Sequence, residues 1–396
     1  MARWLLPENI SDVLPAEARA VEALRRALLD LYRGYGYELV IPPLLEHLDS
    51  LLTGSGHDLD LTTLKLVDQL SGRTLGLRAD STPQVARIDS HILNRSGVVR
   101  LCYAGPTLHA RPMHPLASRE PLQVGAEIYG DADFGADQEI LELAVRSART
   151  IGAARAQVDL GHTGVLRALL GEVLHAPAGV EPVLAALTAK DPSALRSAGA
   201  ALSAANRRAL HVLPELNGGL EVLEAARREL PRSAALDAAL DDLARLAQGC
   251  AADAVSIDLS DLHGFRYHTG VTFAVYVAGL KGPLLRGGRY DDIGQAFGRA
   301  RPATGFSLLD LREAAQLHGA APVRAIVAPR LEDAALRAAI EALREQGEVV
   351  VCRPAPESGR GAAADGAEEI GVALTVDREL ALRDGRWQVG PRRTTA

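Results

Sequence analysis

Three short segments carry side chains that could together hold a small polar molecule. In the first, Leu77–Gln84, the Asp80 carboxylate and the Thr82 hydroxyl are two residues apart at the end of a strand-like run. Oxygen atoms in this arrangement can accept hydrogen bonds from an α-ammonium group. The order Asp-Ser-Thr-Pro is also common at the start of a helix, so the segment has a second, purely structural interpretation.

The second segment runs from Gly105 through Arg119 to Glu127 and ends on a strand-like run. Gln123 and Glu127 are separated by an even number of residues, so on a strand both side chains project from the same face. They could line a pocket on that face. They could equally belong to a solvated face of a sheet, and the sequence leaves both interpretations open.

The third segment combines Leu262–Gly270, Arg286–Asp291 and Ala303–Ser307, in which glycines stand beside Tyr267 and Tyr290. We interpret the glycines as tight turns that let the backbone approach a small ligand with aromatic walls. None of the three segments is a phosphate-binding loop or a dinucleotide fingerprint.

A sheet with helices is needed to bring these segments together. Apolar spacing predicts a helix over Pro15–Tyr32 and another over about Asp137–Ile151. Alternating or β-branched runs predict the strands Tyr37–Ile41, Thr74–Arg78, Val98–Tyr103, Leu122–Tyr129, Ala254–Leu259, Val271–Val277 and Thr304–Leu308. Residues 165–250 are rich in Ala, Leu and Arg and predict a helical insertion, or helices that merely cover the sheet.

From Pro322 the pattern predicts a small α/β unit. Its expected elements are a strand at Ala325–Ala328, a helix over Asp333–Glu345 and a strand at Val349–Val351. Ser358–Gly366 is typical of a loop, and we expect the arginine-bearing tail to be frayed.

The composition limits the class of protein. With 396 residues and 47% hydrophobic content, the chain can bury a large core in two or three domains, and its net charge of -7 gives no overall reason to bind tRNA. Cys102, Cys250 and Cys352 form no CxxC pair, so we expect neither a zinc site nor a disulfide framework. We find no signal peptide and no apolar run that could span a membrane, and we expect a cytoplasmic protein.

Four segments resemble those of histidyl-tRNA synthetases: Leu6–Pro15, Tyr35–Pro43, Tyr267–Gly270 and Gly287–Asp291. The resemblance covers about residues 1–315, with the insertion weakly matched. It implies an α+β fold of the class II aminoacyl-tRNA synthetase type, an antiparallel sheet flanked by helices. Residues 1–318 would form the core homologue, and residues 322–396 would resemble a shortened anticodon-binding domain.

The resemblance also implies a histidine pocket. Asp80 and Thr82 would hold the ammonium group, while Asp80 stands where the synthetases have a glutamate. His268 stands where they have a tyrosine. The full set implied for histidine is Asp80, Thr82, Gln123, Glu127, Tyr267, His268 and Tyr290.

The ATP side departs from the family. The Phe-Arg-x-Glu pattern reads Leu108–Arg111 here, so His109 replaces an arginine and Arg111 replaces an acid; the following loop, Pro112–Ser118, is less basic than expected. His263 stands at a further arginine position, and Arg312 aligns with a third as a remnant. Adenylate formation needs guanidinium groups around the α-phosphate, so the sequence predicts that this chemistry is lost.

Synthetase-like proteins that lack these residues act as regulatory subunits of a short ATP phosphoribosyltransferase, and the sequence resembles them. The resemblance implies a dimer without catalysis, cofactor, metal or tRNA, which binds histidine and a short-form catalytic subunit at the first step of histidine biosynthesis. Two alternatives stay open at this point. They are a divergent histidyl-tRNA synthetase and a free-standing histidine sensor.

Overall fold

The computed structural model describes residues 4–53, 57–171, 174, 177–189, 191–199, 202–317, 322–353 and 374–392. Contacts within the chain divide it into two compact units. The first contains residues 1–12 and 21–318, and the second contains residues 13–20 and 319–396. We describe each unit by itself.

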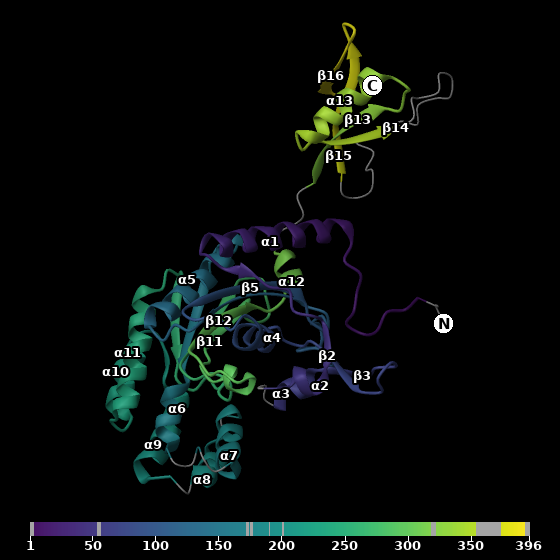
Figure 1. The fold of residues 1–396 in the computed structure, drawn as a ribbon. Helices are drawn as coiled ribbons and strands as arrows, with labels where there is room; N and C mark the ends of the chain where they lie inside the picture. The colour runs from purple at the N-terminus through teal and green to yellow at the C-terminus, as the bar shows by residue number, and fades with distance from the viewer. Residues whose placement is uncertain are drawn as a thin grey trace. The chain divides into compact units, whose positions relative to one another are not determined.

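A nine-stranded sheet forms the centre of the first unit (Figure 1). Its order is β1-β5-β6-β12-β11-β10-β7-β9-β8, and the pairs β1–β5 and β7–β9 are parallel while the other pairs are antiparallel. The strands are β1 (Glu38–Leu39), β5 (Val99–Pro106), β6 (Leu122–Tyr129), β7 (Ala156–His162), β8 (Asn217–Gly218), β9 (Ala254–Asp258), β10 (Val271–Val277), β11 (Leu285–Arg289) and β12 (Ala303–Leu308). The predicted α+β antiparallel sheet flanked by helices is confirmed.

The prediction was wrong at β11. Gly287 and Gly288 lie within this strand and do not form the turn that we expected. A Cβ on Gly287 would meet the carbonyl oxygen of Gly305 and the ring of Phe273, so the glycine lets neighbouring strands approach closely.

Two helices cover the sheet near the site. The helix α5 (Phe134–Thr150) is capped by Asp133, whose side chain accepts a hydrogen bond from Gly135 N, and it packs against β6, β10, β11 and β12. The helix α1 (Pro15–Gly34) buries Tyr32, whose ring lies edge-on to Phe306 with the ring centroids 5.9 Å apart. Tyr32 and Phe306 are buried by these contacts.

The predicted helical insertion is present. Its helices are α6 (Thr163–Leu170), α7 (Pro177–Thr188), α8 (Pro192–Ala198), α9 (Ala204–Val212), α10 (Glu221–Glu229) and α11 (Ala234–Gly249) (Figure 1). The helix α11 packs on β7 and β10, whereas α7, α8 and α9 pack in sequence on one another. Part of the segment therefore covers the sheet and part forms a bundle of its own.

A small sheet that we did not predict as a unit lies beside the segment carrying Asp80. Its order is β2-β4-β3, with β2 (Leu45–His47), β3 (Leu64–Val67) and β4 (Thr74–Leu77), accompanied by α2 (Leu48–Leu51) and α3 (His57–Thr62). The strand β4 leads directly to Arg78 and Asp80, so this sheet aims the first candidate segment at the main sheet.

Residues 322–353 and 374–392, the described part of the second unit beyond α1, form a four-stranded sheet and one helix. The elements are β13 (Val323–Pro329), α13 (Ala334–Glu345), β14 (Val349–Arg353), β15 (Leu374–Arg383) and β16 (Arg386–Pro391), in the sheet order β14-β13-β15-β16. The expectation of a frayed tail is wrong for Arg386–Pro391, which pairs with β15 across a turn where Asp384 and Gly385 have positive φ. The predicted loop Ser358–Gly366 lies outside the described residues.

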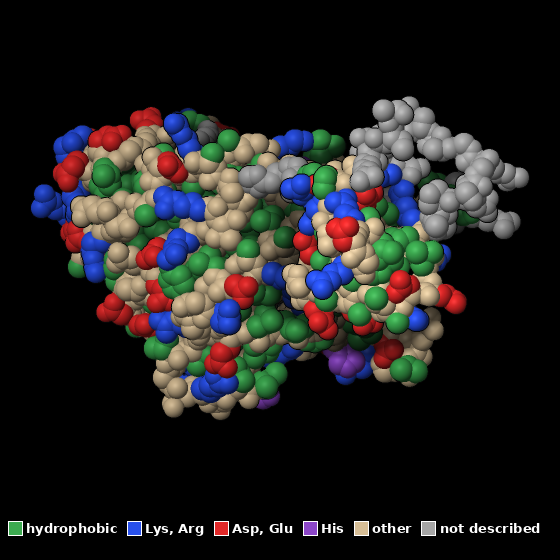
Figure 2. Space-filling view, turned by 90° about the horizontal axis from the view of Figure 1, so that it is seen from above, with side chains coloured by type: hydrophobic (Ala, Val, Ile, Leu, Met, Phe, Trp, Pro, Cys, Tyr) green, Lys and Arg blue, Asp and Glu red, His purple; other side chains and the backbone are tan. Residues whose placement is uncertain are grey.

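The described surface mixes charges of both signs. In Figure 2, basic and acidic side chains are interspersed with hydrophobic ones on the face that is shown. Cys102, Cys250 and Cys352 are free thiols. Within the described ranges, no helix combines the length and apolar character needed to cross a bilayer.

Candidate functional site

Gln123 and Glu127 project from the same face of the central strand β6, and both are buried. Their exposed fractions are 7% and 1%, so the alternative of a solvated sheet face is wrong. Gly125 lies between them, and a Cβ there would overlap the Tyr103 hydroxyl. The absence of a side chain at this position therefore lets Tyr103 reach across the strand to Glu127.

The Asp80–Thr82 segment is both a helix start and part of the buried polar network. The helix α4 (Thr82–Arg87) begins here, and Asp80 Oδ1 accepts a hydrogen bond from Thr82 N at 3.1 Å. The same oxygen accepts from Gln123 Nε2 at 2.9 Å, while Gln123 Oε1 accepts from Ser81 N at 2.9 Å. The amide of Gln123 thus locks this turn against β6.

Glu127 is the buried carboxylate at the centre of the site. It accepts hydrogen bonds from the hydroxyls of Tyr290, of Tyr103 at 3.1 Å and of Thr82 at 3.3 Å. Burial raises the pKa of Glu127 to about 8, and these hydroxyls only partly oppose that rise. The carboxyl group is therefore mostly protonated near pH 7 until a cation approaches it.

Glycine at position 305 leaves the space that this carboxyl group occupies. Gly305 pairs with Glu127 across β12 and β6, and a Cβ on Gly305 would overlap Glu127 Oε2. Gly287, Gly288 and Gly305 thus serve contact between strands, a role that differs from the turns we expected. Gly264 does lie in a turn with positive φ, as expected.

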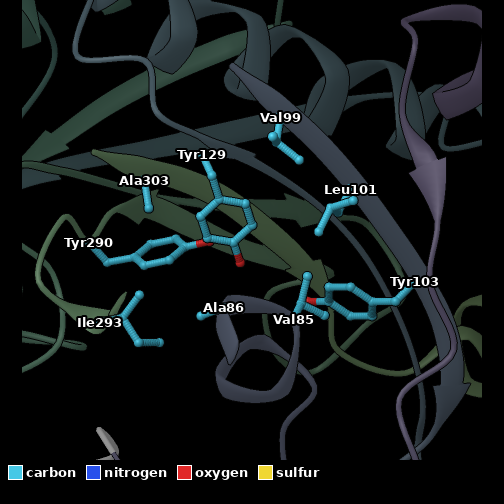
Figure 3. Packing of buried hydrophobic residues seen from close by; sticks show 9 residues of the cluster. All are labelled: Val85, Ala86, Val99, Leu101, Tyr103, Tyr129, Tyr290, Ile293 and Ala303. Atoms are coloured by element: carbon cyan, nitrogen blue, oxygen red, sulfur yellow. The ribbon is translucent and has the colours of Figure 1, made fainter. Parts of the chain in front are cut away.

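Aromatic rings form one wall of the site. The rings of Tyr267 and Tyr290 are stacked, with centroids 5.1 Å apart, and His268 lies edge-on to both. Figure 3 shows the rings of Tyr129 and Tyr290 with Tyr103 across from them, their hydroxyls turned toward one another. The Tyr267 hydroxyl is buried without a hydrogen-bond partner among the described residues. A buried donor of this kind is suited to receive a ligand atom.

His268 is an uncharged member of this wall. Its Nδ1 donates to the Gly264 carbonyl at 3.3 Å, and burial lowers its pKa to about 4. At neutral pH this side chain supplies shape and a ring edge without positive charge.

An ion-pair network fixes the two turns that carry the aromatic wall. The Arg289 guanidinium donates from Nε to both carboxylate oxygens of Asp137, at 3.1 and 2.9 Å. Asp291 accepts from Thr269 Oγ1 at 3.1 Å and from Ala303 N at 3.0 Å. Tyr290 stands between two of these residues and His268 precedes a third, so the network positions both rings.

The region expected to bind ATP is built differently. His109 Nε2 donates to the Ala79 carbonyl at 3.0 Å, burial lowers the pKa of His109, and Arg119 Nε donates to the His109 carbonyl at 2.9 Å. Arg312 donates to the carbonyls of Glu120 and Ser11 and to the Ser11 hydroxyl, at 3.4, 3.2 and 3.1 Å. These side chains hold backbone segments together.

The structure brings the seven residues predicted from the sequence into one region. Asp80, Thr82, Gln123, Glu127 and Tyr290 are linked by hydrogen bonds, and Tyr267 and His268 join through ring contacts. Sequence reasoning missed Tyr103 and Ser307, whose hydroxyls lie 2.6 Å apart beside this network. The position of Tyr103 within a predicted strand could have indicated that its side chain is buried beside the site. In the part of the chain that is described, no group of three or more His, Cys, Asp or Glu could hold a metal ion.

Comparisons with known proteins agree with this architecture. A family model described as histidyl-tRNA synthetase matches residues 9–313, and one described as ATP phosphoribosyltransferase subunit HisZ C-terminal domain matches residues 323–390. ATP phosphoribosyltransferase regulatory subunits from Ralstonia nicotianae and Burkholderia thailandensis are 55% and 53% identical to the chain. The former match covers 100% of both proteins, and the latter covers 99% of this chain and 100% of the relative.

Solved structures give the same result. An ATP phosphoribosyltransferase regulatory subunit/histidyl-tRNA synthetase from Bacillus halodurans is 27% identical, with a TM-score of 0.76 over 89% of this chain and 93% of that one. A histidyl-tRNA synthetase from Nostoc is 17% identical with a TM-score of 0.71, covering 89% and 86% of the two chains, and it supports the fold alone.

Proposed function

The chain belongs to the family of ATP phosphoribosyltransferase regulatory subunits, and from this premise we propose that it senses histidine and passes that signal to a separate catalytic subunit. Identity of 55% over the full length of an ATP phosphoribosyltransferase regulatory subunit carries the proposal. The match of residues 323–390 to a domain of the same subunit supports it from a second part of the chain.

Histidine is the ligand that we propose for the buried network. Asp80 and Thr82 would accept from the ammonium group, and Glu127 would face the remaining cationic or N–H group of the ligand. The proposed site consists of Asp80, Thr82, Gln123, Glu127, Tyr267, His268 and Tyr290. Titration calorimetry with histidine tests this assignment directly, and an absence of heat from histidine at millimolar concentration would contradict it.

We assign no catalysis of its own to the chain. His109 is uncharged and Arg312 is bonded to backbone carbonyls, which supports the loss of adenylation because that reaction needs cationic groups around a phosphate. Losing two such anchors would remove several kcal/mol of transition-state stabilisation, roughly 3 kcal/mol for each.

The proposed partner is a short-form ATP phosphoribosyltransferase catalytic subunit. Histidine would shift the complex toward whichever conformation binds it more tightly, and the size of inhibition would follow from that difference in affinity. The test mixes the purified chain with the short catalytic subunit and measures sedimentation and activity with and without histidine. The proposal fails if no complex forms and activity is unchanged.

A histidyl-tRNA synthetase is the competing function, because the synthetase family model matches residues 9–313. Histidine-dependent exchange between ATP and pyrophosphate would reveal it. A free-standing sensor would bind histidine and leave the transferase unaffected. The mixing experiment and the exchange assay together therefore separate all three functions.

Self-association as a dimer belongs to the same proposal. The strand β1 stands at the edge of the main sheet, and apolar side chains in and just after it are exposed, with Leu39 at 46% and Ile41 at 79%. Exposed edges with apolar side chains favour pairing with another chain. We expect Ile41→Glu to give monomers in sedimentation velocity.

The proposed domains are a core of residues 1–318 and an accessory domain of residues 322–396. The proposed compartment is the cytoplasm.

A further inference from the structure

A cavity of about 280 Å³ lies beside the proposed histidine site and uses different side chains. Its lining comes from the segment after β1, from the turn before α4 and from the end of β5, as Ile41, Pro42, Leu44, Arg78, Ser81, Tyr103, Ala104, Gly105 and Pro106. The lining includes none of the seven residues proposed for histidine. Its volume is at the small end of the range for ligand sites.

Arg78 brings a buried positive charge to this cavity. Its exposed fraction is 4%, and it donates to the carbonyls of Pro42 and Pro106 at 2.9 and 2.6 Å. Further bonds run from Nε to Pro106 O at 3.2 Å and from Nη1 to Gln84 Oε1 at 3.4 Å. All these acceptors are neutral, and the four bonds use four of the five N–H groups. The carboxylates of Asp80 and Glu46 act on Arg78 from a distance, and among the described residues neither forms a hydrogen bond with it. Buried charges are ordinarily paired directly.

Ser81 supplies a second, independent polar group. Its exposed fraction is 1%, and its hydroxyl has no hydrogen-bond partner among the residues described. The residue stands at the N-cap of α4, yet its side chain makes no capping bond. An unbonded buried hydroxyl is unfavourable, so the Ser81 hydroxyl is available to a polar group of a ligand that enters the cavity.

We propose that this cavity binds a small organic carboxylate, held by Arg78 and the Ser81 hydroxyl, with its hydrocarbon part against Ile41 and Leu44. Guanidinium and hydroxyl groups match a carboxylate, while most of the lining is apolar. An inorganic phosphate would place its remaining oxygens against that apolar surface. An α-amino acid would leave its ammonium group unpaired, because no acidic side chain lines the cavity.

Such a ligand would lie next to the histidine site without sharing it. Tyr103 borders both regions, because its ring lines the cavity and its hydroxyl donates to Glu127 at 3.1 Å. Ser81 stands between Asp80 and Thr82. The proposal does not depend on whether histidine binds.

The test uses the full chain and isobutyrate as the probe, with binding measured by ligand-detected NMR. Isobutyramide has the same shape without the charge, and we expect it to bind at least about tenfold more weakly, the usual loss when a charged hydrogen bond becomes neutral. Equal binding of the acid and the amide, or tighter binding of inorganic phosphate, would overturn the proposal.

A pair of serine variants separates the site from general effects on folding. Ser81→Ala should weaken isobutyrate binding about tenfold. Ser90→Ala is the matched control, because Ser90 is also buried, also has an unbonded hydroxyl within the described residues, and does not line the cavity. Equal effects of the two variants would reject the site. The site would also be rejected if isobutyrate did not bind the wild-type chain. If, in addition, Ser81→Ala alone weakened self-association, the cavity would be filled by a second copy of the chain.

Discussion

Two regions of the first unit use their polar side chains in opposite ways. Around Glu127, the polar side chains bond mainly to one another. The hydroxyls of Thr82 and Tyr103 donate to the Glu127 carboxylate, and the Gln123 amide joins Asp80 and the Ser81 backbone. Around His109, the polar side chains bond to backbone carbonyls and hold segments of chain in place.

The difference separates a site that can exchange partners from one that has become part of the framework. A buried network of side chains can give up an internal hydrogen bond to a ligand at little net change in free energy. The Arg312 guanidinium holds the carbonyls of Glu120 and Ser11, so releasing it would free the segments to which these residues belong. We therefore propose that the first region remains a binding site, whereas the second stabilises the fold.

The largest effect should come from filling the space under Glu127. We expect Gly305→Ala to displace the carboxyl group, lower the free energy of unfolding by about 2 kcal/mol and weaken histidine binding about a hundredfold. Denaturant titration and calorimetry measure the two quantities. Gly282→Ala is the control, because nothing lies within 4 Å of a Cβ there. If Gly305→Ala bound histidine with unchanged affinity, Glu127 would not be part of the histidine site.

Replacing the carboxyl group itself should act mainly on binding. Glu127→Gln keeps the shape of the protonated acid, so the chain should fold, while its histidine affinity should fall at least about tenfold because an anion can no longer form. Calorimetry on the two proteins checks this. Equal affinity would show that the ligand does not use a charged Glu127.

The same variant tests the pH dependence of stability. Burial raises the pKa of Glu127 to about 8, whereas an unfolded chain has a value of about 4.3. Between these pH values the folded protein holds a proton that the unfolded chain has lost. The contribution of Glu127 to the free energy of unfolding is therefore fully present below about pH 4.3 and falls as the pH rises toward 8. The difference in unfolding free energy between wild type and Glu127→Gln should follow this course, by up to about 1.4 kcal/mol per pH unit. A flat difference would contradict it.

Restoring a cation in the second region should destabilise the fold without creating activity. We expect His109→Arg to lower the free energy of unfolding by about 1–2 kcal/mol, because it loses the bond to the Ala79 carbonyl and buries a charge. Histidine-dependent exchange of ATP and pyrophosphate should stay at background. Arg111→His, at an exposed position, is the control for the reverse change. Measurable exchange of ATP and pyrophosphate by His109→Arg would show that the region around His109 can still support adenylation.

The smallest effect is expected at Arg312. Arg312→Ala should lower stability by about 1 kcal/mol and speed proteolysis of residues 4–12, because the bonds to Ser11 are lost. Histidine affinity should not change. Arg232→Ala, at an exposed loop position, controls for the loss of charge. If Arg312→Ala lowered histidine affinity and Arg232→Ala did not, the regions around Glu127 and His109 would both take part in binding histidine.

Strands buried in the middle of the sheet were predicted well from the sequence. The bounds of Leu122–Tyr129 and Val271–Val277 agree with the structure because apolar and β-branched residues dominate both runs. The even spacing of Gln123 and Glu127 correctly placed them on one face.

The missed elements owe their structure to distant partners. Leu64–Val67 is mostly exposed, and Ala156–His162 is a polar mixture that becomes a strand by pairing with β10 and β9. The β15–β16 hairpin contains several arginines, and we expected the arginine-bearing tail to be frayed. Their strand state depends on pairing with β13, which local sequence does not reveal.

The bonds between Arg312 and Ser11 also bear on phosphate binding. If Arg312 turned toward a nucleotide phosphate, it would lose both bonds to Ser11, and the residues that precede α1 would lose this contact. At this position, binding a phosphate and holding the N-terminal segment therefore compete for the same guanidinium group.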